Sequence, residues 1–239
     1  MVLVAAVALG SATFAWFVTN NTVKATTSSI SAQSNASYMT IKYNATAVGV
    51  DDTFDVATDD NVQLYPATFG EQAGSTKGTF MTGYGSTVKD GTLSGELSTV
   101  GTPDEADTKS FAKKLKFNIS SRGQNLTNLR VESVEAKSAD GNDTDLSTQS
   151  DINSALRILV KCGDKWVVLD KSGTFKLGSD GITASNGVLS DTVTADTDTE
   201  VDIYLFYEGS DSNVYTNNLG KLTASSKVTV TFTADNGNK

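Results

Sequence analysis

Apolar and polar residues alternate with a period of two in several stretches of the chain, which is typical of half-buried β-strands. These stretches are residues 39–44, 111–119, 129–131, 156–162, 201–207 and 228–233. Residues 201–207 carry apolar side chains on both faces, so we expect this strand to lie in the centre of a sheet. Gly163 and Asp164 separate residues 156–162 from the apolar run 166–169, which predicts a hairpin.

Residues 51–107 show a weaker pattern, because acidic pairs, many glycines and the two prolines interrupt it. Here we expect long connections with short strands near residues 62–69 and 80–81, and we assign no helix. Residues 151–155 predict one short helical turn. The sequence therefore predicts an all-β fold, an antiparallel jelly-roll-like sandwich with long loops, formed by residues 38–239 as one domain with a loop-rich insertion at about 51–107.

The N-terminal segment is almost entirely apolar up to Phe17 and then becomes polar. Thr13 and Ala15 stand where small residues precede a signal-peptide cut, so residues 1–15 are expected to be an export signal, or else a retained hydrophobic helix. The first basic residue is Lys24, so we expect a native start upstream or a trimmed chain. Residues 16–37 then form an expected extended N-terminal arm, and the localisation is secreted, extracellular or at the cell surface.

The composition narrows the choice of partners. The 239 residues carry a net charge of −9, which repels phosphate backbones and anionic lipid headgroups, so neither nucleic acid nor peripheral membrane binding is expected. The single cysteine, Cys162, leaves no intrachain disulfide, and its alternation with apolar neighbours predicts a buried position.

Histidine is absent, which removes Ser–His–acid triads, Cys–His nucleophiles and imidazole metal sites together. We therefore expect no enzyme and no catalytic residue. No cofactor is expected, and calcium is the one ion for which the sequence offers oxygen ligands. The calcium candidates are Asp196, Asp198 and Glu200, with Asp140 and Asn142 in a second cluster, and the alternative is a solvated acidic surface.

Aromatic residues offer a second candidate chemistry. Trp16, Trp166, Tyr204, Phe206 and Tyr207 could present a platform for a sugar ring, but aromatic residues on alternating strands usually supply burial. We expect most of them to belong to the core.

Three stretches resemble one family. Gly10-Ser-Ala-Thr-Phe-Ala-Trp-Phe17, followed by Asn21-Thr-Val-Lys-Ala25, is similar to the SipW-type export signal of the TasA/camelysin-like matrix proteins of Gram-positive bacteria. Residues 111–131 resemble the paired strands of that family, and residues 201–211 with 228–232 resemble its closing strands. The resemblance covers much of the chain.

This resemblance implies a jelly-roll subunit of an extracellular, biofilm-matrix fibre in which an N-terminal arm adds a strand to the next subunit. An extended arm saturates an open sheet edge, and head-to-tail repetition of that contact gives a filament. Self-association into a homopolymer is thus the expected partnership, with accessory matrix proteins or polysaccharide as further partners. The candidate assembly residues are Trp16, Phe17, Val18, Val23, Ile30 and Ala32. A pilin-like subunit with a retained hydrophobic helix and a cell-surface carbohydrate-binding module remain as alternatives.

Overall fold

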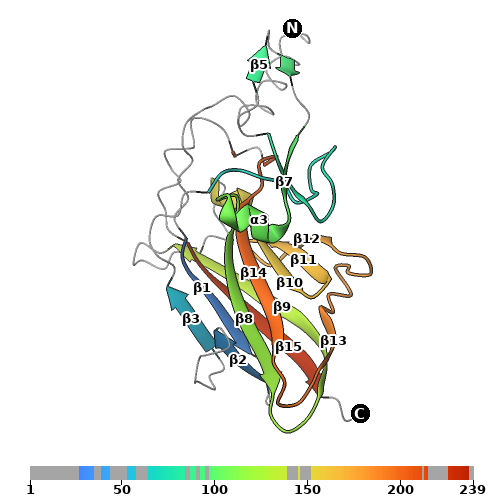
Figure 1. Ribbon diagram of the computed structural model, residues 1–239. Coiled ribbons are helices and arrows are strands. Elements are labelled where there is room, and N and C mark those ends of the chain that lie inside the picture. The colour runs from blue at the N-terminus through green and yellow to red at the C-terminus, as the bar shows by residue number, and fades with distance from the viewer. Residues whose placement is uncertain are drawn as a thin grey trace.

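The computed structural model describes residues 27–34, 39–43, 53–57, 64–83, 87–89, 92–94, 97–138, 145, 152–211, 213–214 and 226–236. Within these residues strands predominate and form an all-β sandwich of two packed sheets (Figure 1). No helix among the described residues combines the length and the apolar character needed to cross a bilayer.

One sheet has five strands in the order β13-β9-β15-β1-β3. Its strands are β1 (Thr27–Ser34), β3 (Thr53–Ala57), β9 (Leu126–Ser138), β13 (Ser190–Val193) and β15 (Ser226–Asn236). The β1–β15 pair is parallel, whereas the other pairs of this sheet are antiparallel.

The other sheet has six strands in the order β12-β11-β10-β14-β8-β2, all paired antiparallel. Its strands are β2 (Met39–Tyr43), β8 (Lys113–Ser121), β10 (Leu156–Cys162), β11 (Lys165–Asp170), β12 (Phe175–Gly178) and β14 (Thr199–Tyr207). Two small hairpin-like pairs join β4 (Phe80–Thr82) to β7 (Ser98–Gly101) and β5 (Thr87–Lys89) to β6 (Thr92–Ser94).

The strand pattern read from the sequence is confirmed in its main features. β14 lies between β10 and β8 and is buried from Val201 to Tyr207, as its two apolar faces predict. Gly163 and Asp164 connect β10 to β11 in the expected hairpin, and Ile152–Ala155 forms one 3₁₀ turn. Cys162 is buried.

The six-stranded sheet is buried on both faces. Its inner face packs against the five-stranded sheet around Phe117, Ile158 and Leu205. Its outer face carries an aromatic cluster in which Phe69, Phe80 and Phe111 come from residues 64–111. Phe80 meets Phe206 of β14 edge to face with ring centroids 5.0 Å apart, so these connecting residues cover the sheet and act as part of the core.

A short helix, α3 (Pro103–Thr108), lies in front of β14 in this covering layer (Figure 1). The sequence analysis assigned no helix to residues 51–107, and that assignment is wrong at α3. Thr102 accepts a hydrogen bond from the backbone N–H of Glu105, and the Glu105 carboxylate accepts one from the backbone N–H of Thr102. Pro103 adds a fixed φ at the first turn, so six residues suffice for a capped helix.

The expected boundary of the arm at residues 16–37 also needs correction. Residues 27–34 form β1, which lies between β15 and β3 of the chain's own five-stranded sheet. Ile30 and Ala32 are both 0% exposed within the core between the sheets. The reason is pairing: β1 satisfies the backbone groups of two neighbouring strands, which an arm outside the domain would leave open.

Candidate functional site

The first candidate site is the position of β1 between β15 and β3, called the β1 slot below. Ile30 lies beside Val228 of β15 on one side and opposite Val56 of β3 on the other. Because the register is continuous from Ser29 to Ser34 along β15, both edges of β1 are engaged over most of its length. The β1 slot is thus the place of one extended strand between β15 and β3, with Ile30 and Ala32 as its inward residues.

β1 is tied to the sandwich by distant parts of the chain. The parallel neighbour of β1 is β15, the last strand that the structure describes. Residues 35–38 connect β1 to β2, which belongs to the opposite sheet. The two partners of β1 are therefore β15 near the C-terminus and β3, which follows β2 in the chain. A strand held by such long-range pairing can be supplied by any copy that carries the same segment.

The second candidate site lies on β9, at the other side of the same sheet. β13 pairs with β9 only from Leu126 to Leu129. After Leu129, no other described strand pairs with β9 on the side away from β15. A single bridge joins Lys137 to Asp145 farther along. Between Arg130 and Ala136, β9 is therefore longer than β13, the strand that pairs with it on this side among the described residues.

Two hollows follow this edge in line, and we call residues 130–137 with these hollows the β9 seam. The larger hollow, about 520 Å³, lies between β9 and residues of β11, β12 and the loop 183–187. Val131, Val167, Leu169 and Phe175 give it an apolar floor. The smaller, about 350 Å³, is lined by Val134, Glu135, Ala136, Lys137, Asp145, Lys171 and Ser172.

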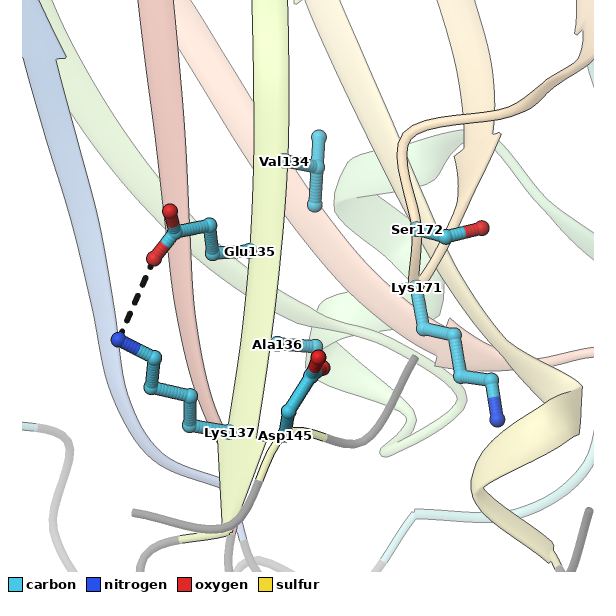
Figure 2. A pocket seen from close by; sticks show the side chains of 7 residues that line it. All are labelled: Val134, Glu135, Ala136, Lys137, Asp145, Lys171 and Ser172. Carbon is cyan, nitrogen blue, oxygen red and sulfur yellow. Dashed lines mark ion pairs between the residues drawn. The ribbon is translucent and has the colours of Figure 1, made fainter. Parts of the chain in front are cut away.

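Figure 2 shows the smaller hollow, with Lys171 and Ser172 across from Val134 and Ala136. Glu135 and Lys137 project to the other side of β9, where they form an ion pair of 3.3 Å. Between the hollows the β11–β12 turn approaches β9 closely at Gly173, which has φ of +78°. A Cβ there would lie 3.3 Å from the backbone nitrogen of Val134, so glycine permits this contact.

The structure divides the predicted acidic row: Asp196 and Asp198 lie in the turn before β14, and Glu200 lies in β14. Asp198 pairs with Lys42 at 3.0 Å and Glu200 pairs with Lys116 at 2.8 Å. The second pair joins the adjacent strands β14 and β8, and the first joins the turn before β14 to β2, so each of the two acids has an ammonium partner. Asp196 has φ of +56° in the preceding turn and is exposed. Among the described residues no three acidic or thiol side chains are grouped so that they could hold a metal ion.

The same row continues into a more buried cluster. Lys114 lies 2.9 Å from Asp202 and 2.6 Å from Asp104 of α3, and the Tyr204 hydroxyl donates to Asp104 at 2.8 Å. Burial opposes the charge on Lys114, but hydrogen bonds with the two carboxylates outweigh it and raise the pKa of Lys114. The hydrogen bond from Lys114 lowers the pKa of Asp104. Lys114 and Asp104 thus keep their ordinary charges, and the cluster ties α3 to β8 and β14.

A second ionic cluster was not anticipated from the sequence. Arg157 of β10 is 6% exposed and lies 2.8 Å from Glu71 and 3.9 Å from Asp211. Glu208, directly after β14, is also buried, and burial raises its pKa to about 7. The signal available in the sequence is the placement of Arg157 and Glu208 inside or beside otherwise apolar strands, where a charged residue needs partners.

Several predicted site residues lie outside the described residues, namely Trp16, Phe17, Val18 and Val23 of the arm and Asp140 and Asn142 of the second acidic cluster. The remaining arm residues, Ile30 and Ala32, both face the core from the β1 slot. Of the aromatic residues, Trp166, Tyr204, Phe206 and Tyr207 are buried, as expected for core residues. These four therefore offer no exposed platform for a sugar ring.

Comparison with family models, with curated proteins and with solved structures finds no match for this chain. Its two candidate sites are made of backbone edges and apolar grooves, and the ionisable clusters near them are ion pairs. Such an arrangement is suited to strand pairing between chains.

Proposed function

We propose that this protein is the structural subunit of an extracellular filament whose copies join head-to-tail by donating the N-terminal strand to the next copy. The observation that carries the proposal is the β1 slot: the first strand of the chain fills a groove beside the last strand. In a single chain this groove is filled by its own β1. In a filament it is filled by β1 of the neighbouring copy.

The exchange costs little free energy at equilibrium, because β1 makes the same contacts in its own copy and in the neighbouring copy. Ile30 and Ala32 enter an identical core, and the ladders to β15 and β3 re-form in the same register. Only residues 35–38, which link β1 to β2, need a different course. Since donor and acceptor surfaces differ, a growing filament keeps a free slot at one end and a free β1 strand at the other, and an open chain grows.

The resemblance to TasA/camelysin-like matrix proteins supports the same reading, because that family implies a secreted fibre subunit with a donated N-terminal strand. The absence of histidine supports a structural role over a hydrolytic one. We accordingly propose that the protein is secreted, with its own copies as the main partner and with matrix proteins or polysaccharide as further partners.

A disulfide lock tests the proposal. Ala32 and Val230 are paired neighbours in β1 and β15, and adjacent strands lie about 4.8 Å apart, within the span of a disulfide. In a Cys162→Ala background, Ala32→Cys with Val230→Cys should hold β1 in its own slot when oxidised. We expect monomers alone in size-exclusion chromatography and electron microscopy, and filaments after reduction.

The matched control shares one substitution. Val230 also pairs with Val134 of β9, so Val230→Cys with Val134→Cys joins two strands that the exchange does not separate. This oxidised control should form filaments as the unmodified chain does. Filaments of normal length from the oxidised lock, or no filaments from the unmodified chain at any concentration, would refute the proposal.

A further inference from the structure

We infer that residues 65–72 form a pH-dependent cover, which loosens from the six-stranded sheet when the carboxyl of Glu208 loses its proton. These residues, called the cover segment below, are hydrogen-bonded to the end of β14 and contribute Phe69 to the aromatic cluster on the outer face of that sheet. The inference concerns one copy of the chain, so it holds whether or not copies join into a filament.

The cover segment is attached to the sheet directly beside Glu208. The N–H of Ala67 donates to the carbonyl of Tyr207 at 3.0 Å, and the N–H of Gly209 donates to the carbonyl of Ala67 at 3.0 Å. Glu208 stands between these two partners in the chain and is 1% exposed. A change in the charge of Glu208 therefore acts at the attachment itself.

The two oxygens of the Glu208 carboxyl have different surroundings. Oε1 accepts hydrogen bonds from the backbone N–H of Ser210 at 3.1 Å and from its hydroxyl at 2.7 Å. Oε2 is buried, and among the described residues no hydrogen bond of normal length and angle reaches it. Because an unpaired charge is costly in such a place, the carboxyl is most stable with a proton on Oε2.

A single guanidinium serves the other acids of this cluster. The charged groups gathered around Glu208 are Glu71 from the cover segment, Arg157 from β10 and Asp211 from the turn after β14. Arg157 lies 2.8 Å from Glu71 and 3.9 Å from Asp211. One positive and two negative charges leave this group negative before Glu208 ionises, so a third carboxylate is not compensated.

Loss of the proton weakens the tie between Arg157 and the cover segment. An ionised Glu208 repels the Glu71 carboxylate and competes with it for the guanidinium of Arg157. Burial, assisted by Glu71, raises the pKa of Glu208 to about 7, although the hydroxyls of Ser210 and Thr68 oppose the shift. The tie is therefore weakened close to neutral pH.

The cover segment shields part of the aromatic cluster. The ring of Phe69 lies 4.6 Å from that of Phe80 and 4.9 Å from that of Trp166, measured between centroids. Ile158 and Leu205 belong to the separate core between the two sheets. A loosened cover thus exposes aromatic surface on the outer face above neutral pH, while the core between the sheets stays closed.

Hydrogen exchange of the full chain tests the inference, with each observed rate corrected for the intrinsic rate at the same pH. We expect the protection of the Ala67 and Gly209 amides to fall about tenfold from pH 6 to pH 8, because the closed state loses its proton in this range. Low concentrations of urea should leave this exchange unchanged, since local opening exposes little surface.

Two matched substitutions show whether Glu208 is the cause. Glu208→Gln removes the titration, so protection at Ala67 should differ less than about twofold between the two pH values. Glu200→Gln removes an exposed carboxylate and should retain the tenfold fall. The inference is overturned if protection in the natural chain does not depend on pH, if the fall persists in Glu208→Gln, or if exchange at Ala67 rises with urea as it does in β10.

A second variant covers the case in which Glu208→Gln does not fold. Glu71→Gln removes the neighbouring charge and frees Arg157 to meet an ionised Glu208. We expect the midpoint of protection against pH to move to lower pH by at least about half a unit. An unchanged midpoint would show that these carboxyls do not act on each other, and the inference would fall.

Discussion

Glu208 is a buried carboxyl whose protonation differs from that of an exposed glutamate. Its side chain is buried between the end of β14 and residues 67–71, and its Oε1 accepts hydrogen bonds from the backbone and the hydroxyl of Ser210. Burial, assisted by the nearby Glu71 carboxylate, raises the pKa of Glu208 from 4.5 to about 7. The folded protein therefore holds a proton that the unfolded chain releases at a lower pH.

This shift sets the sign of a pH dependence. Between pH 4.5 and about 7 the folded state binds more protons than the unfolded state, so the free energy of unfolding falls as pH rises, by up to about 3 kcal/mol from this group. Glu208→Gln keeps an accepting oxygen and removes the titration. We expect the variant to match the natural chain near pH 4.5 and to exceed it in stability at pH 8.

Urea unfolding at the two pH values measures this difference. Glu200→Gln is the control, because Glu200 lies at the surface in an ion pair with Lys116 and should leave the pH slope nearly unchanged. If Glu208→Gln and the natural chain show the same dependence on pH, the carboxyl is not protonated in the folded state at neutral pH.

At the scale of elements, α3 shows how a short helix depends on its cap. Thr102 and Glu105 satisfy each other's backbone N–H groups, and the helix then buries Ala106 in the aromatic cluster. We expect Thr102→Ala to lower the free energy of unfolding by about 1 kcal/mol, since a side-chain cap is lost. Thermal or urea unfolding measures this, with exposed Thr194→Ala as the control. Equal stability of the two variants would show that α3 does not need its cap.

Local sequence carries the information for some of these elements and not for others. Alternation in residues 156–162 and 201–207 is a property of each segment alone, so β10 and β14 were predictable. The residues Thr102-Pro-Asp-Glu105 match the capping-box pattern, so the start of α3 was also predictable, although the sequence analysis missed it. Both signals act within a few residues of chain.

The position of β1 in the sheet could not be predicted from local sequence. Ile30 and Ala32 give only a thin alternation in a segment rich in Ser and Thr, and their burial follows from pairing with β15 at the far end of the chain. The β9 seam is harder still, because it arises where β13 ends short of a longer neighbour. Such sites depend on the lengths of strands from different parts of the chain, which no single segment encodes.

At the scale of the whole molecule, the sandwich combines a filled core with edges that remain available. The outer face of the six-stranded sheet is covered by residues 64–83 and 97–112, so contact through that face is blocked by the chain itself. The five-stranded sheet offers the β1 slot near one edge and the β9 seam near the other. Donation of β1 to a neighbouring copy, as proposed above, would use the first of these two sites.

Net charge opposes any such assembly. Copies that each carry −9 repel one another, and this repulsion acts over the Debye length, about 30 Å at 0.01 M salt and about 8 Å at 0.15 M. We therefore expect filament growth, followed by light scattering, to be about tenfold faster at 0.15 M sodium chloride than at 0.01 M. Hydrophobic and backbone contacts in the slot are little affected by this change, so the salt effect reports the repulsion.

The same assay separates general screening from a specific cation. Calcium and magnesium at equal ionic strength should accelerate growth equally, because Asp198 and Glu200 already pair with Lys42 and Lys116. If calcium alone accelerates growth, and if the Asp196→Asn variant loses this acceleration, the hypothesis that the acidic row binds calcium is supported instead. Growth that slows as sodium chloride rises would mean that attraction between opposite charges on neighbouring copies outweighs the repulsion of their net charge.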